Sequence, residues 1–267
     1  MKIKHFGMPT LLELGSIEEC AKLCMELGLK FVEINMNFPI YQLELLNPKI
    51  LADIAEKYGI YYTIHLEEKF SPCDFNEKVA KAYTETVLEM IELAKKLNVS
   101  IINMHLTDCV FVTLPTKKVF LFDTYNDAYM QKLISFRNKC EAAIGDSGIR
   151  ICVENTGGFN SADYLQKSLE TLLESPAFAM TFDIGHNACI DFADDAVINE
   201  HIGRLSHMHI HDAKEKSNHL TLGDGNLDLQ RYINMATEYD CRMVLETKTI
   251  TSLKNSVRWL KENGLFD

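Results

Sequence analysis

Short apolar, β-branched runs alternate with amphipathic stretches along the whole sequence. Strand side chains alternate between two faces, whereas a helix repeats its apolar face every three to four residues. On these periods the pattern predicts strands at 3–6, 31–37, 60–66, 100–106, 150–156 and 178–184, in the stretch that begins at Arg204, and at 242–247. Helices are predicted at about 17–27, 48–58, 76–97, 126–143, 161–174, 193–202, 229–239 and 251–262.

Local signals mark several helix ends. Ser16 with Glu19 three residues later forms a capping box, Pro48 suits a first helical turn, and Gly59 can end the helix that Pro48 begins. Regular alternation of strand and helix implies a parallel sheet, and eight such units predict a closed (β/α)₈ TIM barrel that spans residues 1–267 as one domain. A doubly wound open sheet is the alternative fold, but the first loop, GMPTLLELG, lacks the glycine-rich phosphate-binding turn.

The loop after the fourth strand interrupts this alternation. Residues 109–123, CVFVTLPTKKVFLFD, predict an inserted β-hairpin with its turn at residues 115–118. Apolar side chains in such a hairpin are costly to leave in water, so they should cover the barrel mouth as a lid or contact a second subunit in a homodimer.

Composition excludes several classes of function. The chain carries 27 Lys and Arg against 38 Asp and Glu, a net charge of −11, without a basic block, which argues against nucleic acid as a partner. No apolar run approaches the roughly 18 residues of a membrane span, and the first residues lack the apolar core of a signal peptide. We therefore expect a soluble, cytoplasmic protein without a membrane partner.

Ionisable side chains gather at the ends of the predicted strands. His207, His209 and His211 alternate with Met208 and Ile210, so one strand face carries imidazoles and the other hydrocarbon. The same alternation gives other strands an inward polar face with Glu33 and Asn35, Thr63 and His65, Asn103 and His105, Cys152 and Glu154, Thr181 and Asp183, and Val244 and Glu246.

In a TIM barrel these strand ends converge on one mouth. Several carboxylates in one cavity would repel one another unless a cation lay among them. Mixed Glu, Asp and His ligands indicate a divalent metal, either Mn²⁺, Co²⁺, Mg²⁺ or Zn²⁺.

The motifs VENTGG, FDIGH, HIHDAK, HLTLGDGNLD and LETK resemble the xylose-isomerase-like TIM-barrel superfamily. It includes sugar phosphate isomerases and epimerases, ketose 3-epimerases, inosose isomerases and dehydratases, and endonuclease IV. The resemblance implies one metal held by Glu154, Asp183, His209 and Glu246, with His186 in contact with the substrate.

For function, the resemblance implies an isomerase or epimerase of a small carbohydrate: a sugar, a sugar phosphate or an inositol derivative. The metal would stabilise an enediolate while Glu154 and Glu246 act as base and acid. An inosose-type dehydratase is a further possibility. Substrate contacts are also predicted for His65, His105, Lys214 and Glu33, with Glu33 at the mouth or in a buried ion pair.

Endonuclease IV, a zinc enzyme that cleaves abasic DNA, is the rival within the resemblance. Its additional ligands match His65 and His105, and then His186 and His219, which are therefore candidate ligands of a second site. The Asp expected two residues before His219 is Ser217, a poor zinc ligand, so the third zinc site should be weak or absent. Of the remaining histidines, His207 is expected in the core and His211 at the rim.

Overall fold

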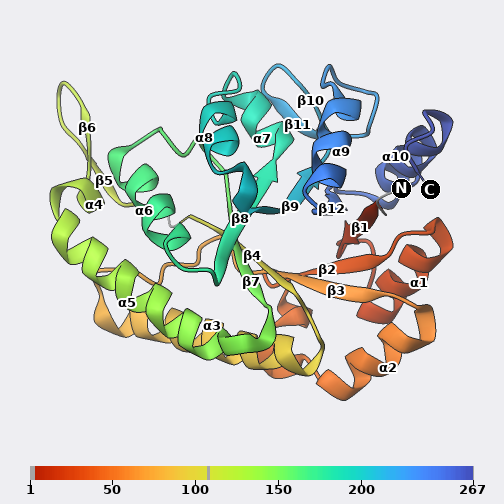
Figure 1. Cartoon of the computed structure of the whole chain (residues 1–267), viewed down its shortest axis with the longest axis horizontal. Coiled ribbons are helices and arrows are strands. Elements are labelled where there is room, and N and C mark those ends of the chain that lie inside the picture. The colour runs from red at the N-terminus through yellow and green to blue at the C-terminus, as the bar shows by residue number, and fades with distance from the viewer. Residues whose placement is uncertain (1–3, 107–108, 267) are drawn as a thin grey trace.

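The computed structural model describes residues 4–106 and 109–266. Eight parallel strands close into a barrel in the order β1-β12-β9-β8-β7-β4-β3-β2 (Figure 1), so the predicted (β/α)₈ TIM barrel is confirmed. The barrel strands are β1 (His5–Pro9), β2 (Phe31–Asn35), β3 (Tyr61–His65), β4 (Ile101–His105), β7 (Arg150–Glu154), β8 (Phe178–Asp183), β9 (Leu205–Ile210) and β12 (Arg242–Leu245).

Helices surround the barrel, and α3 and α5 lie side by side on its outside (Figure 1). The main ones are α1 (Ile17–Leu27), α2 (Pro48–Tyr58), α3 (Glu77–Lys96), α5 (Asn126–Ile144), α6 (Asp163–Leu173), α8 (Asp195–Glu200), α9 (Leu229–Glu238) and α10 (Ile250–Glu262). Shorter turns are α4 (Leu121–Thr124), α7 (Ile184–Cys189), η1 (Pro39–Tyr41), η2 (Leu43–Leu45), η3 (Gly145–Ser147) and η4 (Ile202–Arg204). No helix of the described residues is long and apolar enough to cross a membrane.

Two small hairpins stand on the loops of the barrel. The predicted one forms from β5 (Phe111–Thr113) and β6 (Lys118–Phe120) and projects beside α4 in Figure 1. The second, β10 (Asp212–Lys214) with β11 (Ser217–Leu220), follows β9 directly and was not expected from the sequence. It brings His219 back toward the strand ends.

The main apolar core lies between the strands and the helices. Residues such as Ile34, Ile64 and Met208 point outward into it. Inside the barrel, Ile101, Cys152 and Ala179 form a small separate apolar layer. Two residues further along each strand the interior turns polar, because the alternation of strand side chains places Asn103, Glu154 and Thr181 above that layer. The polar half of the barrel interior is therefore the half that can carry chemistry.

Candidate metal centre

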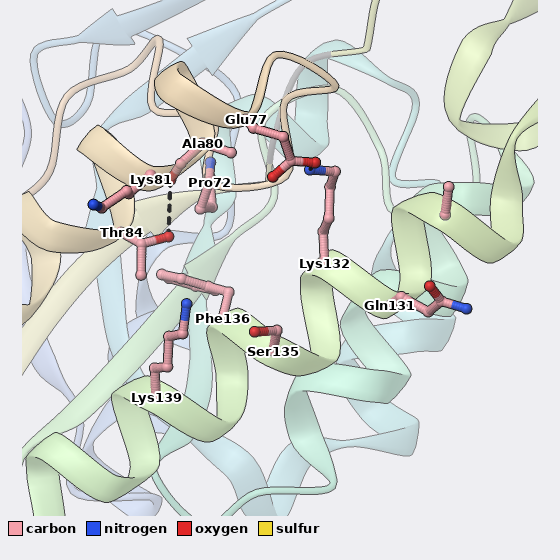
Figure 2. Close-up of a pocket in the computed structure, with 11 residues that line it drawn as sticks. Pro72, Glu77, Ala80, Lys81, Thr84, Gln131, Lys132, Ser135, Phe136 and Lys139 are labelled. Carbon is pink, nitrogen blue, oxygen red and sulfur yellow. Dashed lines mark hydrogen bonds and ion pairs between the residues drawn. The ribbon is translucent and has the colours of Figure 1, made fainter.

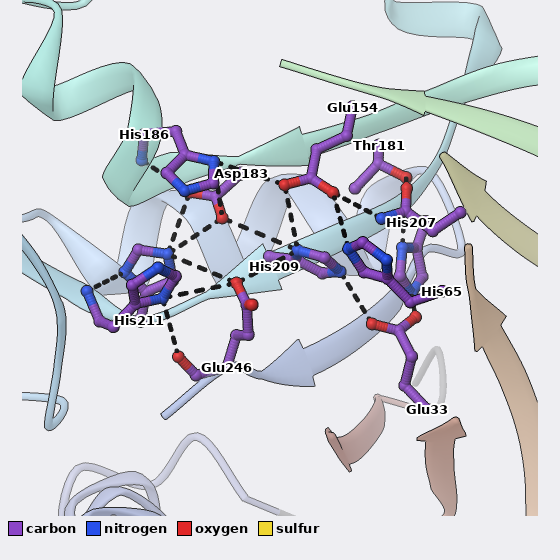
Figure 3. Close-up of polar contacts among 12 residues, drawn as sticks. Glu33, His65, Glu154, Thr181, Asp183, His186, His207, His209, His211 and Glu246 are labelled. Atoms are coloured by element: carbon purple, nitrogen blue, oxygen red, sulfur yellow. Dashed lines mark hydrogen bonds and ion pairs between the residues drawn. The ribbon is translucent and has the colours of Figure 1, made fainter. Parts of the chain in front are cut away.

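Four side chains from consecutive barrel strands meet around one nitrogen atom. Nδ1 of His209 lies 3.3 Å from Oε2 of Glu246, 3.5 Å from Oε1 of Glu154 and 3.7 Å from Oδ2 of Asp183. All four residues are at most 8% exposed, and Figure 3 shows them pointing toward one another. The structure thus brings together the four predicted metal ligands.

The orientation of His209 decides whether this group fits a cation. Its Nε2 lies 3.0 Å from Oε1 of Glu33, and a carboxylate can only accept, so Nε2 carries the proton. Nδ1 is then the free lone pair, and it finds no hydrogen-bond partner among the described residues; the same holds for Oε2 of Glu246. Buried acceptor atoms that face one another without a hydrogen bond are costly unless a positive charge lies between them. One imidazole and three carboxylates therefore fit a divalent metal.

The electrostatics agree with this fit. Burial alone would raise the pKa of Glu154, but the neighbouring His209 and His105 outweigh it and hold that pKa well below its ordinary value. Burial alone would lower the pKa of His209, yet Glu154, Glu246 and Glu33 hold it well above its ordinary value. Without a metal the carboxylates thus favour a second proton, on Nδ1 of His209, and a metal ion would displace that proton and use the Nδ1 lone pair.

A second group of ligands faces the other oxygen of Glu154. Nε2 of His65 and Nε2 of His105 each lie 3.5 Å from Oε2 of Glu154. Nδ1 of His65 lies 2.7 Å from the carbonyl of Leu66 and donates to it, which leaves Nε2 as a lone pair toward the carboxylate. These three residues satisfy the geometry of a second metal position.

The remaining histidines lie on the Asp183 side. His186 lies in the first turn of α7, where its backbone N–H donates to Oδ1 of Asp183. Its Nδ1 lies 3.3 Å from Oδ2 of Asp183 and 3.4 Å from Oε1 of Glu154. Burial alone would lower the pKa of His186, but Asp183 and Glu154 raise it to about 9. Nδ1 of His219 lies 3.5 Å from Oε2 of Glu246. Both histidines therefore border the cluster, and their role as ligands of a second site stays a prediction.

His211 was expected at the rim, but it is fully buried. Its Nδ1 accepts from the backbone N–H of His219 at 2.9 Å, so Nε2 carries the proton and donates to Asp183 at 3.0 Å. Of the described residues His211, His219 and Glu246 also cluster like metal ligands, but this bonding occupies both nitrogens of His211. Its role is to orient the carboxylate of Asp183.

Other predicted site residues lie farther from the four ligands or deeper than expected. Glu33 is 1% exposed and is bonded to His209, which matches the buried-pair alternative rather than the mouth. Lys214 is exposed on the second hairpin, opposite Ser217 in the strand register. Asp212 accepts from the backbone N–H groups of Gly223 and Gly225 and thereby fixes the turn after β11.

A small cavity of about 140 Å³ opens beside Glu154. Phe120 of the inserted hairpin forms one wall of it, which favours the lid interpretation. The outer residues Phe111, Val112 and Leu114 remain exposed. The described residues that line the cavity include no Lys or Arg: they are Leu106, Phe120, Glu154, Thr156, Gly157, Gly158, Phe159, Ser161, Tyr164 and Leu165.

A wider hollow of about 520 Å³ lies outside the barrel between α3 and α5 (Figure 2). Lysines border it, but Lys132 is paired with Glu77 and Lys81 with Glu85. No cluster of potential metal ligands from the described chain lies there. We therefore place the chemistry at the barrel mouth.

The sequence model of one protein family, described as xylose isomerase-like TIM barrel, matches residues 21–263. The chain belongs to this family. Uncharacterized protein MJ1311 of Methanocaldococcus jannaschii is 27% identical over 228 residues, which cover 81% of this chain and 74% of that protein. The structure of a D-tagatose 3-epimerase-like protein has a TM-score of 0.74 and 25% identity, and the match covers 98% of this chain and 96% of that one. The 3-keto-D-glucoside 4-epimerase YcjR from E. coli has the same TM-score of 0.74 at 14% identity, over 97% of this chain and all of that one, which shows the fold.

Two supports of this xylose isomerase-like centre were missed from the sequence. The side chain of Asn155, directly after Glu154, bonds both the backbone N–H and the carbonyl of Asp183. Nζ of Lys248 lies 2.8 Å from Oε1 of Glu246. The sequence does contain a signal for both residues: in VEN, Asn155 directly follows the ligand Glu154, and in ETK, Lys248 is two residues after the ligand Glu246.

Proposed function

We propose that the protein is a divalent-metal-dependent isomerase or epimerase of a small carbohydrate. The observation that carries this proposal is that Glu154 and Glu246 both lie within 3.5 Å of Nδ1 of the buried His209. Two carboxylates would therefore flank a metal bound at that nitrogen. The likeness to a D-tagatose 3-epimerase-like protein over nearly the whole chain supports it.

Glu154, Asp183, His209 and Glu246 would hold the metal, as Mn²⁺, Co²⁺, Mg²⁺ or Zn²⁺. When bound, it would supply Lewis-acid polarisation of a substrate carbonyl and neighbouring hydroxyl. Because the pKa values of Glu154 and Glu246 are both held low, both carboxylates are ionised, which is the form that a general base needs. Removal by one glutamate and return by the other inverts the carbon, while return to the adjacent carbon moves the carbonyl.

The cavity beside Glu154 would receive the rest of the substrate. Its aromatic and aliphatic walls can pack against C–H faces, and Ser161 can bond a hydroxyl. A phosphate there would lie near an ionised glutamate with no lysine or arginine in the described lining to balance it. We therefore infer a substrate whose far end is uncharged. His65, His105 and His186 are the proposed substrate contacts on the metal side, and a homodimer contact through the exposed side of the hairpin stays a prediction.

Metal analysis combined with a substrate screen tests the proposal. Purified protein is stripped with chelator, reloaded with each of the four ions, and incubated with a panel of ketoses and aldoses in ²H₂O. We expect metal-dependent solvent deuterium at the carbon next to the carbonyl, and loss of exchange in Glu154→Gln. The variant Glu174→Gln, an exposed surface glutamate on the outside of the barrel, is the control. Exchange that persists without metal would contradict the proposal.

A zinc-dependent phosphodiesterase acting on abasic DNA is the second candidate. The observation that favours it is the His65–His105–Glu154 group, in which Oε2 of Glu154 faces a second ligand set while Oε1 faces the first. Metal stoichiometry separates the two candidates, because one tightly bound ion per chain favours the isomerase and two or more with cleavage of an abasic oligonucleotide favour the nuclease.

A further inference from the structure

A ring of close polar contacts spans the barrel interior and includes two of the ligands, His209 and Glu154. Glu33, His207, Thr181, Asn103, Glu154 and His209 follow one another around it. They come from β2, β9, β8, β4 and β7, and all are at most 1% exposed. Figure 3 shows Glu33 at the opposite end of the cluster from Asp183 and His186.

The bonds of this ring determine what Glu33 can do. Its Oε2 accepts from the hydroxyl of Thr63 at 3.0 Å and lies 3.1 Å from Nε2 of His207. Its Oε1 faces only Nε2 of His209 among the described contacts, at 3.0 Å. Thr63 therefore holds the carboxylate of Glu33 by its Oε2, and Oε1 is left to accept a hydrogen bond from the imidazole of His209.

The other arm of the ring reaches Glu154. The amide nitrogen of Asn103 donates to Oε2 of Glu154, and its oxygen accepts from the hydroxyl of Thr181 at 2.6 Å. The oxygen of Thr181 in turn lies 3.2 Å from Nδ1 of His207. Because the Thr181 hydroxyl donates to Asn103, it accepts from Nδ1–H of His207, and Nε2 of His207 lies beside Glu33 without a hydrogen bond.

We propose that Glu33 is a positioning residue: by accepting a hydrogen bond from Nε2–H of His209 it directs Nδ1 of that ring at the three ligand carboxylates. Imidazole ligands commonly donate their second N–H to a carboxylate, and loss of that partner typically weakens metal binding 10- to 100-fold. The proposal concerns metal binding itself and does not depend on which reaction the centre catalyses.

Wild-type protein loaded with ¹¹³Cd²⁺ and ¹⁵N-labelled at histidine provides the first test. We expect cadmium coupling to Nδ1 of His209, together with a slowly exchanging Nε2–H signal shifted downfield by the carboxylate. Coupling through Nε2 would overturn the proposal. Coupling through both nitrogens would do so as well, because it would place a metal between Glu33, His207 and His209, which also meet the distance criterion for ligands.

Variants then separate positioning from packing. In Glu33→Leu, of similar volume, the Kd for Zn²⁺ should rise about 10- to 100-fold. In Glu33→Gln the amide oxygen can still accept from His209, so most of the affinity should return. The control Glu174→Leu makes the same change at an exposed glutamate on the outside of the barrel, and we expect less than about a threefold change in that Kd. The proposed role would be refuted if Glu33→Leu folds and binds Zn²⁺ with wild-type affinity. It would also be refuted if Glu33→Gln binds Zn²⁺ as weakly as Glu33→Leu. If Glu33→Leu does not fold, the cadmium spectrum of the wild-type protein is the deciding test.

Discussion

The absence of a side chain at Gly185 leaves room for the ring of His211, so the substitution Gly185→Ala should disturb the metal centre. A Cβ atom built on Gly185 would lie 2.0 Å from Cε1 and 2.3 Å from Nδ1 of His211. Both contacts are far inside van der Waals distance. Because His211 is fully buried, its ring cannot move without breaking the bonds to Asp183 and to the backbone of His219.

The cost of Gly185→Ala can be estimated from three contributions. Overpacking in a dense interior costs about 1–3 kcal/mol. Loss of a hydrogen bond to a charged group adds about 1.5–3 kcal/mol. Because Gly185 lies within α7, the higher helix propensity of alanine stabilises the folded state by roughly 1 kcal/mol and offsets part of this loss. The net loss is about 1.5–5 kcal/mol, which for a chain of this size lowers Tm by roughly 3–20 °C.

Thermal unfolding of the metal-free protein measures this loss, and titration with Zn²⁺ measures the effect on Asp183, whose misorientation should weaken binding by about 10-fold or more. Gly203→Ala is the matched control, because a Cβ atom there meets nothing within 4 Å. A Gly185→Ala protein as stable as the control, with unchanged metal affinity, would refute the assigned role of His211.

Three further results are expected. Glu154→Gln and Glu246→Gln should each reduce kcat/KM by about 10²- to 10⁴-fold, and near-normal turnover in either would exclude it as acid or base. Free ketoses should outperform their terminal phosphates by at least about 10-fold in kcat/KM, and a preference for phosphates would contradict the uncharged cavity. In metal-free protein, the pKa of His186 is raised from 6.5 to about 9, so its stabilisation is complete below pH 6.5 and is lost as the pH rises through about 9. Tm measured from pH 6 to 10 should fall accordingly, and a flat profile would be inconsistent with the charge on His186.

Much of the barrel could be predicted because its signals are local. Helices 17–27 and 48–58 have their predicted ends, since Ser16 caps the first and Gly59, with φ of 65°, ends the second. The second hairpin was missed because EKSN reads as a polar loop, and its strands pair only with each other. Helix α7 was missed because six residues are too few to show a helical period; its start depends on the side chain of Asp183.

For the candidate site, the sequence predicts which residues lie together but not how each side chain is oriented. Parallel strands end at one mouth, so alternation alone brings Glu154, Asp183 and His209 together. Which nitrogen each histidine presents depends on partners distant in sequence, as with His209 and Glu33, and cannot be read from a single strand. The burial of His211 depends on the missing side chain of Gly185 on a neighbouring element. The register of β8 and β9 also shifts between Met180 and Thr181, which no local pattern reveals.

The ring of polar contacts around the ligands also limits how this protein can change through evolution. Replacing a hydrogen-bonded member such as Asn103 or Thr181 leaves a buried donor or acceptor on its neighbour without a partner, and each such loss costs about 1–3 kcal/mol. Substitutions that preserve folding at these positions should then occur in pairs rather than one at a time. The positions are Glu33, Asn103, Thr181 and His207. The outer residues Val112 and Leu114 of the inserted hairpin are exposed, so we expect them to vary more freely than the buried polar residues inside the barrel.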